Sequence, residues 1–600
     1  MLGPELELNI AIPEQTLDSL TFAENTPEAI AKWKNQLPMA NIGETARQLY
    51  MAIRELNILS MSPAERFQAL ESLRQAIHFV CGELSKHFLN RSITPQERQR
   101  KIINLVQTLR FQLAMGYKIV LMTSIPRMGN ELIRKNFGAA SHRVITEYGS
   151  LLLLCDQLYM HAPKTIWQEM HEVYRFCETL GLLRQAVKDE HFELAQETRI
   201  DQAYRRNLLL ACCRPNQLRQ TDINTAYQVF GAWAEYTEFG SGNLNNAVFC
   251  VNFQDDAPPR HKSLSHAALS EHYYGFETAE LVTRLTNYIS ASDEASDKNV
   301  HLPHADKLSN SLLRHLSHAF GILTKRIFKR MASNGHLELA VGISSCHYHH
   351  ASKTSFQKLL IGDQLFDAEQ EDSFISAAQK KQDTWSQSFD AESVMGAQSS
   401  TDDTAIDFGS DKDNSEDKKF PTYKVGLVNT SPGGYCIQWN DELPSNVQAG
   451  ELLCVREIPS KTWSVAVIRW IRHSKQKGTQ LGIELFAPNA QSVAVQQLQR
   501  TGSHSEFMRG LLLPEITAVA QPATLITPRM PFQMGNKVMI RHNGMESKCM
   551  LEEIISETAS FTQFTMNGSN SFDSKSLKYQ TNKKNQFSKE DEFDSLWQDL

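Results

Sequence analysis

The sequence lacks the short motifs on which the common enzyme classes depend. It contains no Gly-x-x-x-x-Gly-Lys-Ser/Thr phosphate loop, no Gly-x-Gly-x-x-Gly element after a strand, no His-Glu-x-x-His pair and no Gly-x-Ser-x-Gly elbow. His171 is followed by Glu172, but the second histidine of a zinc-protease motif is missing. We therefore expect a protein that is not an enzyme and that carries no cofactor.

The chain also lacks an excess of positive charge and paired cysteine spacings. Its 61 Lys and Arg face 68 Asp and Glu, which gives a net charge of −7. Proteins that bind nucleic-acid polymers need a basic footprint, so we expect no such partner. The ten cysteines are scattered, and Cys212 and Cys213 are adjacent, which indicates reduced thiols in a cytoplasm.

Long apolar runs are missing as well. The longest, LAMGYKIVLM and SLLLLCDQLYM, fall far short of the roughly 20 residues that span a bilayer. The acidic start, MLGPELELNIAIPE, has neither the basic region nor the apolar region of a signal peptide. We therefore expect a cytoplasmic protein without a transmembrane segment. What is present, 600 residues with 41% hydrophobic and 22% charged side chains, suits several soluble domains.

Helical periodicity dominates the N-terminal half. After a lead-in over 1–40 that we expect to be extended, apolar residues recur at helical spacing in two groups over 41–290. Two helix starts read SPAE and TPQE, in which Ser62 and Thr94 are the predicted caps. These features predict an all-α bundle or short solenoid whose aromatic stripes form the core and whose surface binds protein partners.

A further helix and strand are predicted over 306–362. The helix ends in KRIFKR, which places Arg326 and Arg330 four residues apart, a spacing that also fits one solvated helix face. The strand is expected in HLELAVGISSCHYHH. An extended strand would divide the cysteine and histidines of SCHYHH between its two faces. We therefore expect no metal site there.

The C-terminal half changes character at an acidic stretch. Residues 363–420 are too polar to form a core and predict a disordered linker. Over 421–513, alternation in YKVGLVNTSPGGYCIQW, SVAVIRWIR and TQLGIELFAP predicts a small antiparallel β-barrel. A small β module over 526–570 and a flexible tail over 571–600 complete the chain. The predicted fold class is thus α+β multidomain, with helices first and the two β domains after them.

The turn NTSPGG carries the chemistry of the predicted barrel. An Asn side chain can hydrogen-bond its own turn, a Ser hydroxyl both donates and accepts, and paired glycines let backbone amides approach a ligand. With SVAVIRW and LGIELF, this segment resembles the PilZ domain, whose signature is Asp/Asn-x-Ser-x-x-Gly. Asn429, Ser431 and Gly434 match that signature. The resemblance implies a bacterial receptor for the second messenger cyclic di-GMP.

The second PilZ signature, Arg-x-x-x-Arg just before the first strand, is missing upstream of Tyr423, where the chain reads DNSEDKKFP. Arg326 and Arg330 supply that spacing much earlier. Either a long insertion separates the two halves of one motif, or the halves belong to two barrel-like modules. Arginine suits the role, because its planar fork binds phosphate in bidentate fashion and its face stacks on a base.

Two functions therefore remain open. In the first, Arg326, Arg330, Asn429, Ser431 and Gly434 bind cyclic di-GMP, and the helical part relays the bound state to protein partners. The resemblance then implies roles in motility, type IV pili or surface attachment, with two secondary candidates on the IRWIR strand, Arg469 and Arg472. In the second, the barrel is a degenerate relative that binds no nucleotide, and the chain is a scaffold.

Overall fold

A computed structural model of the chain divides it into two compact units, Met1–Lys325 and Arg326–Leu600. The structure describes residues 8–191, 194, 197–264, 272–293, 301–321, 330–361, 415–458, 460, 462–474, 478–499, 505–515, 522–542 and 545–567. Arg326, most of the predicted linker over 363–420 and the predicted tail over 571–600 lie outside these residues. Within the described ranges, no helix is long and apolar enough to cross a membrane.

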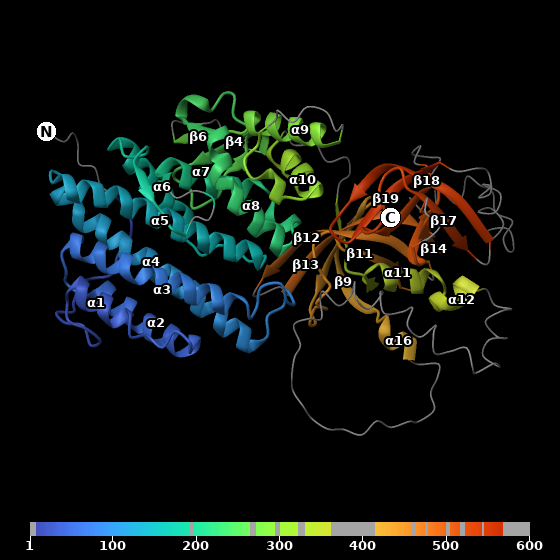
Figure 1. Ribbon diagram of the computed structural model, residues 1–600, viewed down its shortest axis with the longest axis horizontal. Helices are drawn as coiled ribbons and strands as arrows, with labels where there is room; N and C mark the ends of the chain where they lie inside the picture. The colour runs from blue at the N-terminus through green and yellow to red at the C-terminus, as the bar shows by residue number, and fades with distance from the viewer. Residues whose placement is uncertain are drawn as a thin grey trace, which may run out of the picture. The chain divides into compact units, whose positions relative to one another are not determined.

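The first unit is built mainly from helices (Figure 1). Its long helices α3, α4 and α5 pack in sequence, α3 on α4 and α4 on α5. The helices are α1 (Pro27–Lys34), α2 (Ile42–Ile58), α3 (Pro63–Ser85), α4 (Glu97–Ser124), α5 (Glu131–Gln157), α6 (Ile166–Thr179), α7 (Ile200–Cys212), α8 (Gln220–Trp233), α9 (Ala279–Asp293) and α10 (Asn310–Phe320).

Two small antiparallel sheets accompany these helices. One pairs β1 (Ala186–Lys188) with β2 (Glu197–Arg199). The other has the order β3-β6-β4-β5 and is built from β3 (Glu238–Gly240), β4 (Phe249–Asn252), β5 (Arg260–His261) and β6 (Tyr273–Glu277). Strands this short leave almost no periodic signal in a sequence.

The two predicted helix caps had different outcomes. Ser62 caps α3 as predicted: its Oγ accepts from the Glu65 amide at 3.3 Å. Thr94 does not cap α4. The helix begins two residues later, where Gln96 and Gln99 form a capping box. The predicted extended lead-in also contains a helix, α1, which Thr26 caps.

The second unit contains two closed six-stranded antiparallel barrels. The first has the order β10-β13-β12-β11-β8-β9 and closes through the pairing of β9 with β10. Its strands are β8 (His336–Val341), β9 (Tyr423–Ser431), β10 (Gly434–Trp439), β11 (Leu452–Glu457), β12 (Ser464–Ser474) and β13 (Gly478–Pro488). A short strand, β7 (Met331–Ala332), extends the pairing along β9.

The second barrel follows at once, with the order β14-β15-β16-β19-β18-β17. Its strands are β14 (Gln491–Gln497), β15 (Met508–Leu513), β16 (Thr524–Pro528), β17 (Lys537–His542), β18 (Met545–Glu557) and β19 (Phe561–Asn567). The predicted boundary at residue 513 therefore differs from the structure. Strands β14 and β15 pair within this second barrel. Strand β8 belongs to the first barrel although it precedes the long insertion over 342–422, which separates β8 from β9.

The predicted strand over HLELAVGISSCHYHH is correct only in its first half. Gly342, with φ +92°, ends β8, and the chain turns into α11 (Ile343–His350). Helix α12 (Phe356–Ile361) and the short α16 (Ser415–Lys419) complete the described part of the insertion. Burial lowers the pKa of His347 to about 3, so that this side chain is neutral at physiological pH. Among the described residues, no cluster of His, Cys, Asp or Glu is arranged to hold a metal.

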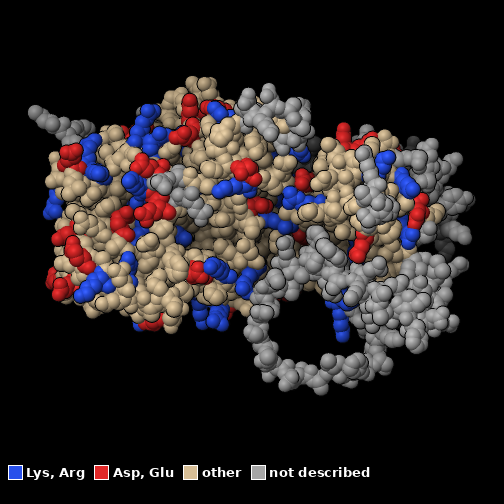
Figure 2. Space-filling view, viewed as in Figure 1, with Lys and Arg blue, Asp and Glu red and all other residues tan. Residues whose placement is uncertain are grey.

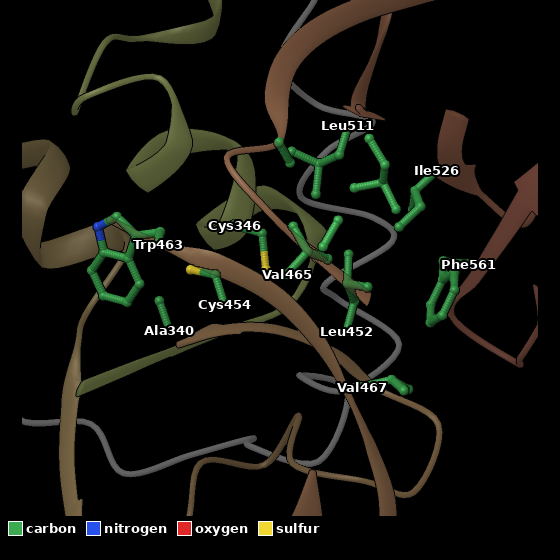
Figure 3. Packing of buried hydrophobic residues seen from close by; sticks show 13 residues of the cluster. Ala340, Cys346, Leu452, Cys454, Trp463, Val465, Val467, Leu511, Ile526 and Phe561 are labelled. Carbon is green, nitrogen blue, oxygen red and sulfur yellow. The ribbon is translucent and has the colours of Figure 1, made fainter. Parts of the chain in front are cut away.

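Helix α11 and the second barrel cover part of the outside of the first barrel. Figure 3 shows the buried cluster that joins them. It contains side chains from β8, β11 and β12, from α11, and from β15, β16 and β19, among them Ala340, Cys454, Val467, Cys346, Leu511, Ile526 and Phe561. Because these side chains are close to fully buried, the two barrels and α11 share one core.

A buried ionic network lies inside the helical unit. Arg74 Nε contacts Glu147 Oε1 at 2.9 Å, and its Nη1 contacts Asp189 Oδ1 at 2.8 Å. His78 Nε2 lies 2.7 Å from Glu147, and Arg143 lies 3.3 Å from Asp189. Burial acts to raise the pKa of the Glu147 carboxyl, but His78 and Arg74 outweigh it and hold that pKa well below its usual value. The Asp189 pKa is lowered likewise, chiefly by Arg74 against burial.

We predict that Arg74→Ala lowers the free energy of unfolding of the helical unit by about 3–5 kcal/mol at pH 7, because it takes from two buried carboxylates the one arginine that contacts both. The loss will be measured by urea unfolding followed by far-ultraviolet circular dichroism. Since both carboxyls have lowered pKa values in the folded state, their contribution to stability is fully present above the ordinary pKa values of 4.5 for Glu and 3.8 for Asp and is lost as pH falls below them.

The matched control is Arg47→Ala, which removes an exposed pair with Glu44 on α2. This variant should unfold like the unchanged protein. Equal effects of the two substitutions would show that the buried network does not stabilise the helical unit.

Candidate functional site

The NTSPGG turn joins β9 to β10 as a tight hairpin. Ser431 and Gly434 are the last paired residues, and Pro432 and Gly433 form the two-residue turn between them. The Ser431 Oγ donates to the Gly434 carbonyl at 3.2 Å, and the Gly433 carbonyl accepts from the Leu485 amide at 3.1 Å. The turn is therefore held by its own serine and by the neighbouring strand β13.

Gly434 is the residue of the turn that no other amino acid can replace without strain. Its φ is +151°, and a Cβ built on it would lie 2.0 Å from the Ile483 carbonyl oxygen. Strand β10 approaches β13 this closely because Gly434 pairs directly with Glu484. The glycine of the motif thus has a packing role in the barrel, whatever else its backbone contacts.

Arg330 lies beside this turn although it is about a hundred positions earlier in the sequence. It immediately precedes β7, in which Met331 pairs with Thr430 and Ala332 with Asn429. Continuing that register sets Arg330 opposite Ser431. The side chain of Arg330 is exposed. Arg326, the other arginine of the predicted pair, lies outside the described residues.

One row of residues crosses the outer surface of the barrel next to Arg330. In register, Trp470 pairs with Gly482, Gly482 with Cys436, and Cys436 with Asn429. Paired residues share a face of the sheet. The next row contains the buried Ile483, which packs inside. The Trp470–Asn429 row therefore faces outward.

The charges of two arginines act on the centre of this row. Burial raises the pKa of the Cys436 thiol, and Arg330 and Arg472 oppose that rise. Arg330 precedes β7 and Arg472 lies near the end of β12, so the two residues flank the row at its opposite ends. The Arg472 guanidinium is 6.0 Å from the centre of the Trp470 ring. The structure brings together Arg330, Arg472, Asn429 and Ser431 around one patch.

The two secondary candidates differ in their partners. Arg469 forms a salt bridge with Glu484 and lies 5.8 Å from the Phe486 ring. Among the residues that the structure describes, neither Arg330 nor Arg472 has a carboxylate within ion-pair distance. An arginine already paired with a carboxylate has less to offer an anionic ligand. Arg472 is therefore the stronger of the two candidates.

Sequence reasoning did not single out Trp470 as a site residue. Its indole lies over Gly482, where a Cβ would meet the Trp470 Nε1 at 1.9 Å. The missing side chain at Gly482 thus makes room for the ring, which is partly exposed on the outer surface. The sequence did hold a signal, a glycine in QLGIELF paired with an aromatic residue in VIRWIR, but only the register shows that the two meet.

We predict that Gly434→Ala destabilises the second unit by about 2–4 kcal/mol, because the new Cβ collides with the Ile483 carbonyl and the backbone conformation is strained. Thermal unfolding followed by near-ultraviolet circular dichroism will measure this. The control is Gly426→Ala on the neighbouring strand β9, where a Cβ meets its nearest atom, the Gln438 carbonyl oxygen, at 3.8 Å. Two variants of equal stability would contradict the packing role of Gly434.

The comparisons with known proteins cover nearly the whole chain. Residues 28–242, 248–492 and 493–567 match the family models described as the N-terminal domain, the middle PilZ domain and the C-terminal beta-barrel domain of the cyclic-di-GMP receptor FimW. The chain is 37% identical over 610 residues to the protein named "Cyclic-di-GMP receptor FimW" of Pseudomonas aeruginosa, with 99% of each chain covered. No solved structure matches.

The match to the middle domain spans the insertion between β8 and β9, so that one PilZ domain includes residues on both sides of it. Its end at residue 492 falls at the start of β14, where the second barrel begins. The predicted resemblance to the PilZ family is confirmed. With three consecutive domain matches and a relative similar over its full length, this chain belongs to the FimW family of PilZ-domain proteins.

Proposed function

We propose that this chain is a receptor that binds cyclic di-GMP on the outer surface of its first barrel. The observation that carries the proposal is the pairing of β7 with β9, which sets Arg330 opposite Ser431. Arg330, the second arginine of one half of the PilZ signature, is thereby next to the other half of the signature. The relative from Pseudomonas aeruginosa is named as a cyclic-di-GMP receptor, which supports the same ligand for this chain.

The chemistry of the patch suits a dinucleotide with two phosphates and two purine bases. Arg330 and Arg326 would bind phosphate in bidentate fashion or stack on guanine, and Arg472 would bind from the opposite side of the row. The amide of Asn429 and the hydroxyl of Ser431 can hydrogen-bond a base edge or a phosphate oxygen. The partly exposed face of Trp470 offers a stacking surface for a purine. Gly434 keeps the turn in place.

The scaffold hypothesis depended on the lack of an arginine just before Tyr423. The topology removes that argument, because β9 is not the first strand of the barrel. The first strands are β7 and β8, and KRIFKR directly precedes them. The order of the two signatures relative to the barrel is therefore the order that the PilZ resemblance requires. A receptor is favoured over a degenerate barrel.

We further propose that the bound state is passed to protein partners through the helical unit, in the control of motility, type IV pili or surface attachment. We also propose a cytoplasmic location and the absence of catalysis, in keeping with a receptor. On the face drawn in Figure 2, Lys and Arg lie among Asp and Glu over the described residues. Such mixed surfaces suit specific protein contacts better than a nucleic-acid polymer.

Calorimetric titration of the full-length protein with cyclic di-GMP will test the proposal, with GTP as the control ligand. We expect micromolar or tighter affinity. Arg330→Ala should weaken binding roughly 10- to 100-fold, because a charge-assisted hydrogen bond contributes about 1.5–3 kcal/mol. Arg472→Ala and Asn429→Ala should each weaken it by about tenfold.

The matched control is Arg469→Ala on the same strand as Arg472. Since Arg469 is already paired with Glu484, its loss should change the affinity by less than about threefold. If folded protein binds no cyclic di-GMP, the scaffold hypothesis takes the place of the receptor. If Arg330→Ala leaves the affinity unchanged, the ligand binds elsewhere.

A further inference from the structure

The outer surface of the second barrel carries a small exposed patch of methionine and lysine. In the register of β17 and β18, Lys537 pairs with Met550 and Met539 with Lys548. The four side chains form a two-by-two arrangement in which each lysine lies across from a methionine. We call these four residues the Met/Lys patch. They alternate along the strands with residues of the barrel core such as Val538, so the patch faces outward.

The patch has properties of a docking surface. Met550 is 38% exposed, and both lysines are exposed. Five of the large apolar side chains that are exposed in the described chain fall between residues 530 and 555, so apolar surface is concentrated in this barrel. Methionine adapts its shape to different apolar partners and is common at binding surfaces.

The lysines of the patch are available for an acidic partner. Among the described residues, neither Lys537 nor Lys548 forms an ion pair. The neighbouring charged side chains, in contrast, already have partners. Arg541 contacts Glu546, and Glu552 accepts a hydrogen bond from Asn567 at 2.7 Å. The patch therefore combines two methionine side chains with two positive charges that no described carboxylate pairs with.

The chain itself contains a segment with complementary chemistry. Its last residues read SKEDEFDSLWQDL. Four apolar residues recur at the spacing i, i+3, i+4 and i+7, the spacing typical of an amphipathic segment that binds as a helix: Phe593, Leu596, Trp597 and Leu600. Five acidic residues and one lysine stand between and before them. The segment thus pairs an apolar stripe with negative charge, the counterpart of the Met/Lys patch.

The position where the described chain ends favours an intramolecular contact. Strand β19 ends at Asn567, and Asn567 pairs with Met550 of the patch. The 33 residues over 568–600 therefore start at the patch itself. A connection of about 22 residues, 568–589, has a root-mean-square span of roughly 23–28 Å, and such a tether gives a local concentration in the millimolar range. Even weak affinity suffices for binding under these conditions.

We propose that the C-terminal segment 590–600 docks on the Met/Lys patch of its own chain. The apolar stripe covers Met539 and Met550, and the acidic residues neutralise Lys537 and Lys548. The proposal concerns the second barrel alone and does not depend on cyclic di-GMP binding. It assigns the patch one occupant, the chain's own end.

Hydrogen–deuterium exchange of the full-length protein, read by mass spectrometry, tests this docking. We expect amides over 590–600 to exchange at least about tenfold more slowly than in a free peptide of the same sequence. A variant with Lys537→Glu, Lys548→Glu and Met550→Ser should lose that protection. A matched control with the same chemical changes at exposed sites of the helical unit, Lys164→Glu, Lys307→Glu and Met51→Ser, should keep it.

A charge exchange guards against misfolding of the patch variant. Adding Glu592→Lys and Asp594→Lys to Lys537→Glu and Lys548→Glu should restore the protection, which damage to the barrel would not allow. The proposal fails if 590–600 exchange like the free peptide in the unchanged protein, or if the patch variant stays protected. Protection that declines on dilution would identify a second copy as the occupant and would overturn docking within one chain.

Discussion

Strand β9 is hydrogen-bonded along both of its edges, and the first barrel exists only because of this. One edge pairs with β7 and β8, which come before the insertion, and the other pairs with β10, which follows it. The closed barrel leaves no unpaired strand edge at this point. The same pairing determines where Arg330 lies. Because Met331 of β7 pairs with Thr430 of β9, Arg330 lies beside the NTSPGG turn. Fold and candidate site thus depend on one set of backbone hydrogen bonds.

The outside of the first barrel is divided between packing and exposure. Side chains such as Ala340, Cys454 and Val467 are buried under α11 and the second barrel (Figure 3). The row from Trp470 to Asn429 lies on β12, β13, β10 and β9, beyond that buried cluster. A helix that begins directly after β8 is well placed to cover β8 and β11. The insertion therefore contributes to the core of this unit, while none of the elements that form this buried cluster is the one that carries Arg330, on which the candidate patch depends.

Much of the architecture could be predicted from the sequence, because strand alternation and helix periodicity are local signals. Ser62 and the strands around NTSPGG are examples. The predictions that failed involve positions where one residue decides the outcome. Gly342 turns a predicted strand into α11, and Gln96 takes the cap expected of Thr94. The barrel boundaries could not be read from composition, since β14 and β15 look like any other apolar strands and only their pairing assigns them.

The candidate site shows the same division. Asn429, Ser431 and Gly434 are adjacent in sequence, so their motif could be recognised directly. The adjacency of Arg330 to them, and of Trp470 to Gly482, depends on strand register across distant segments, which no local pattern contains. Arg469 and Arg472 likewise differ as candidate ligand residues because of one carboxylate: strand pairing places Glu484 next to Arg469, and the two form a salt bridge.

The central claim is that residues on both sides of the insertion bind one ligand together. A double-mutant cycle of Arg330→Ala and Asn429→Ala, read as cyclic di-GMP affinity by calorimetry, tests it most directly. Residues that share a bound ligand are expected to couple, and we predict an interaction free energy of about 1 kcal/mol or more. Effects that add within about 0.3–0.5 kcal/mol would mean that the two residues act independently, and would contradict a single site formed across the insertion.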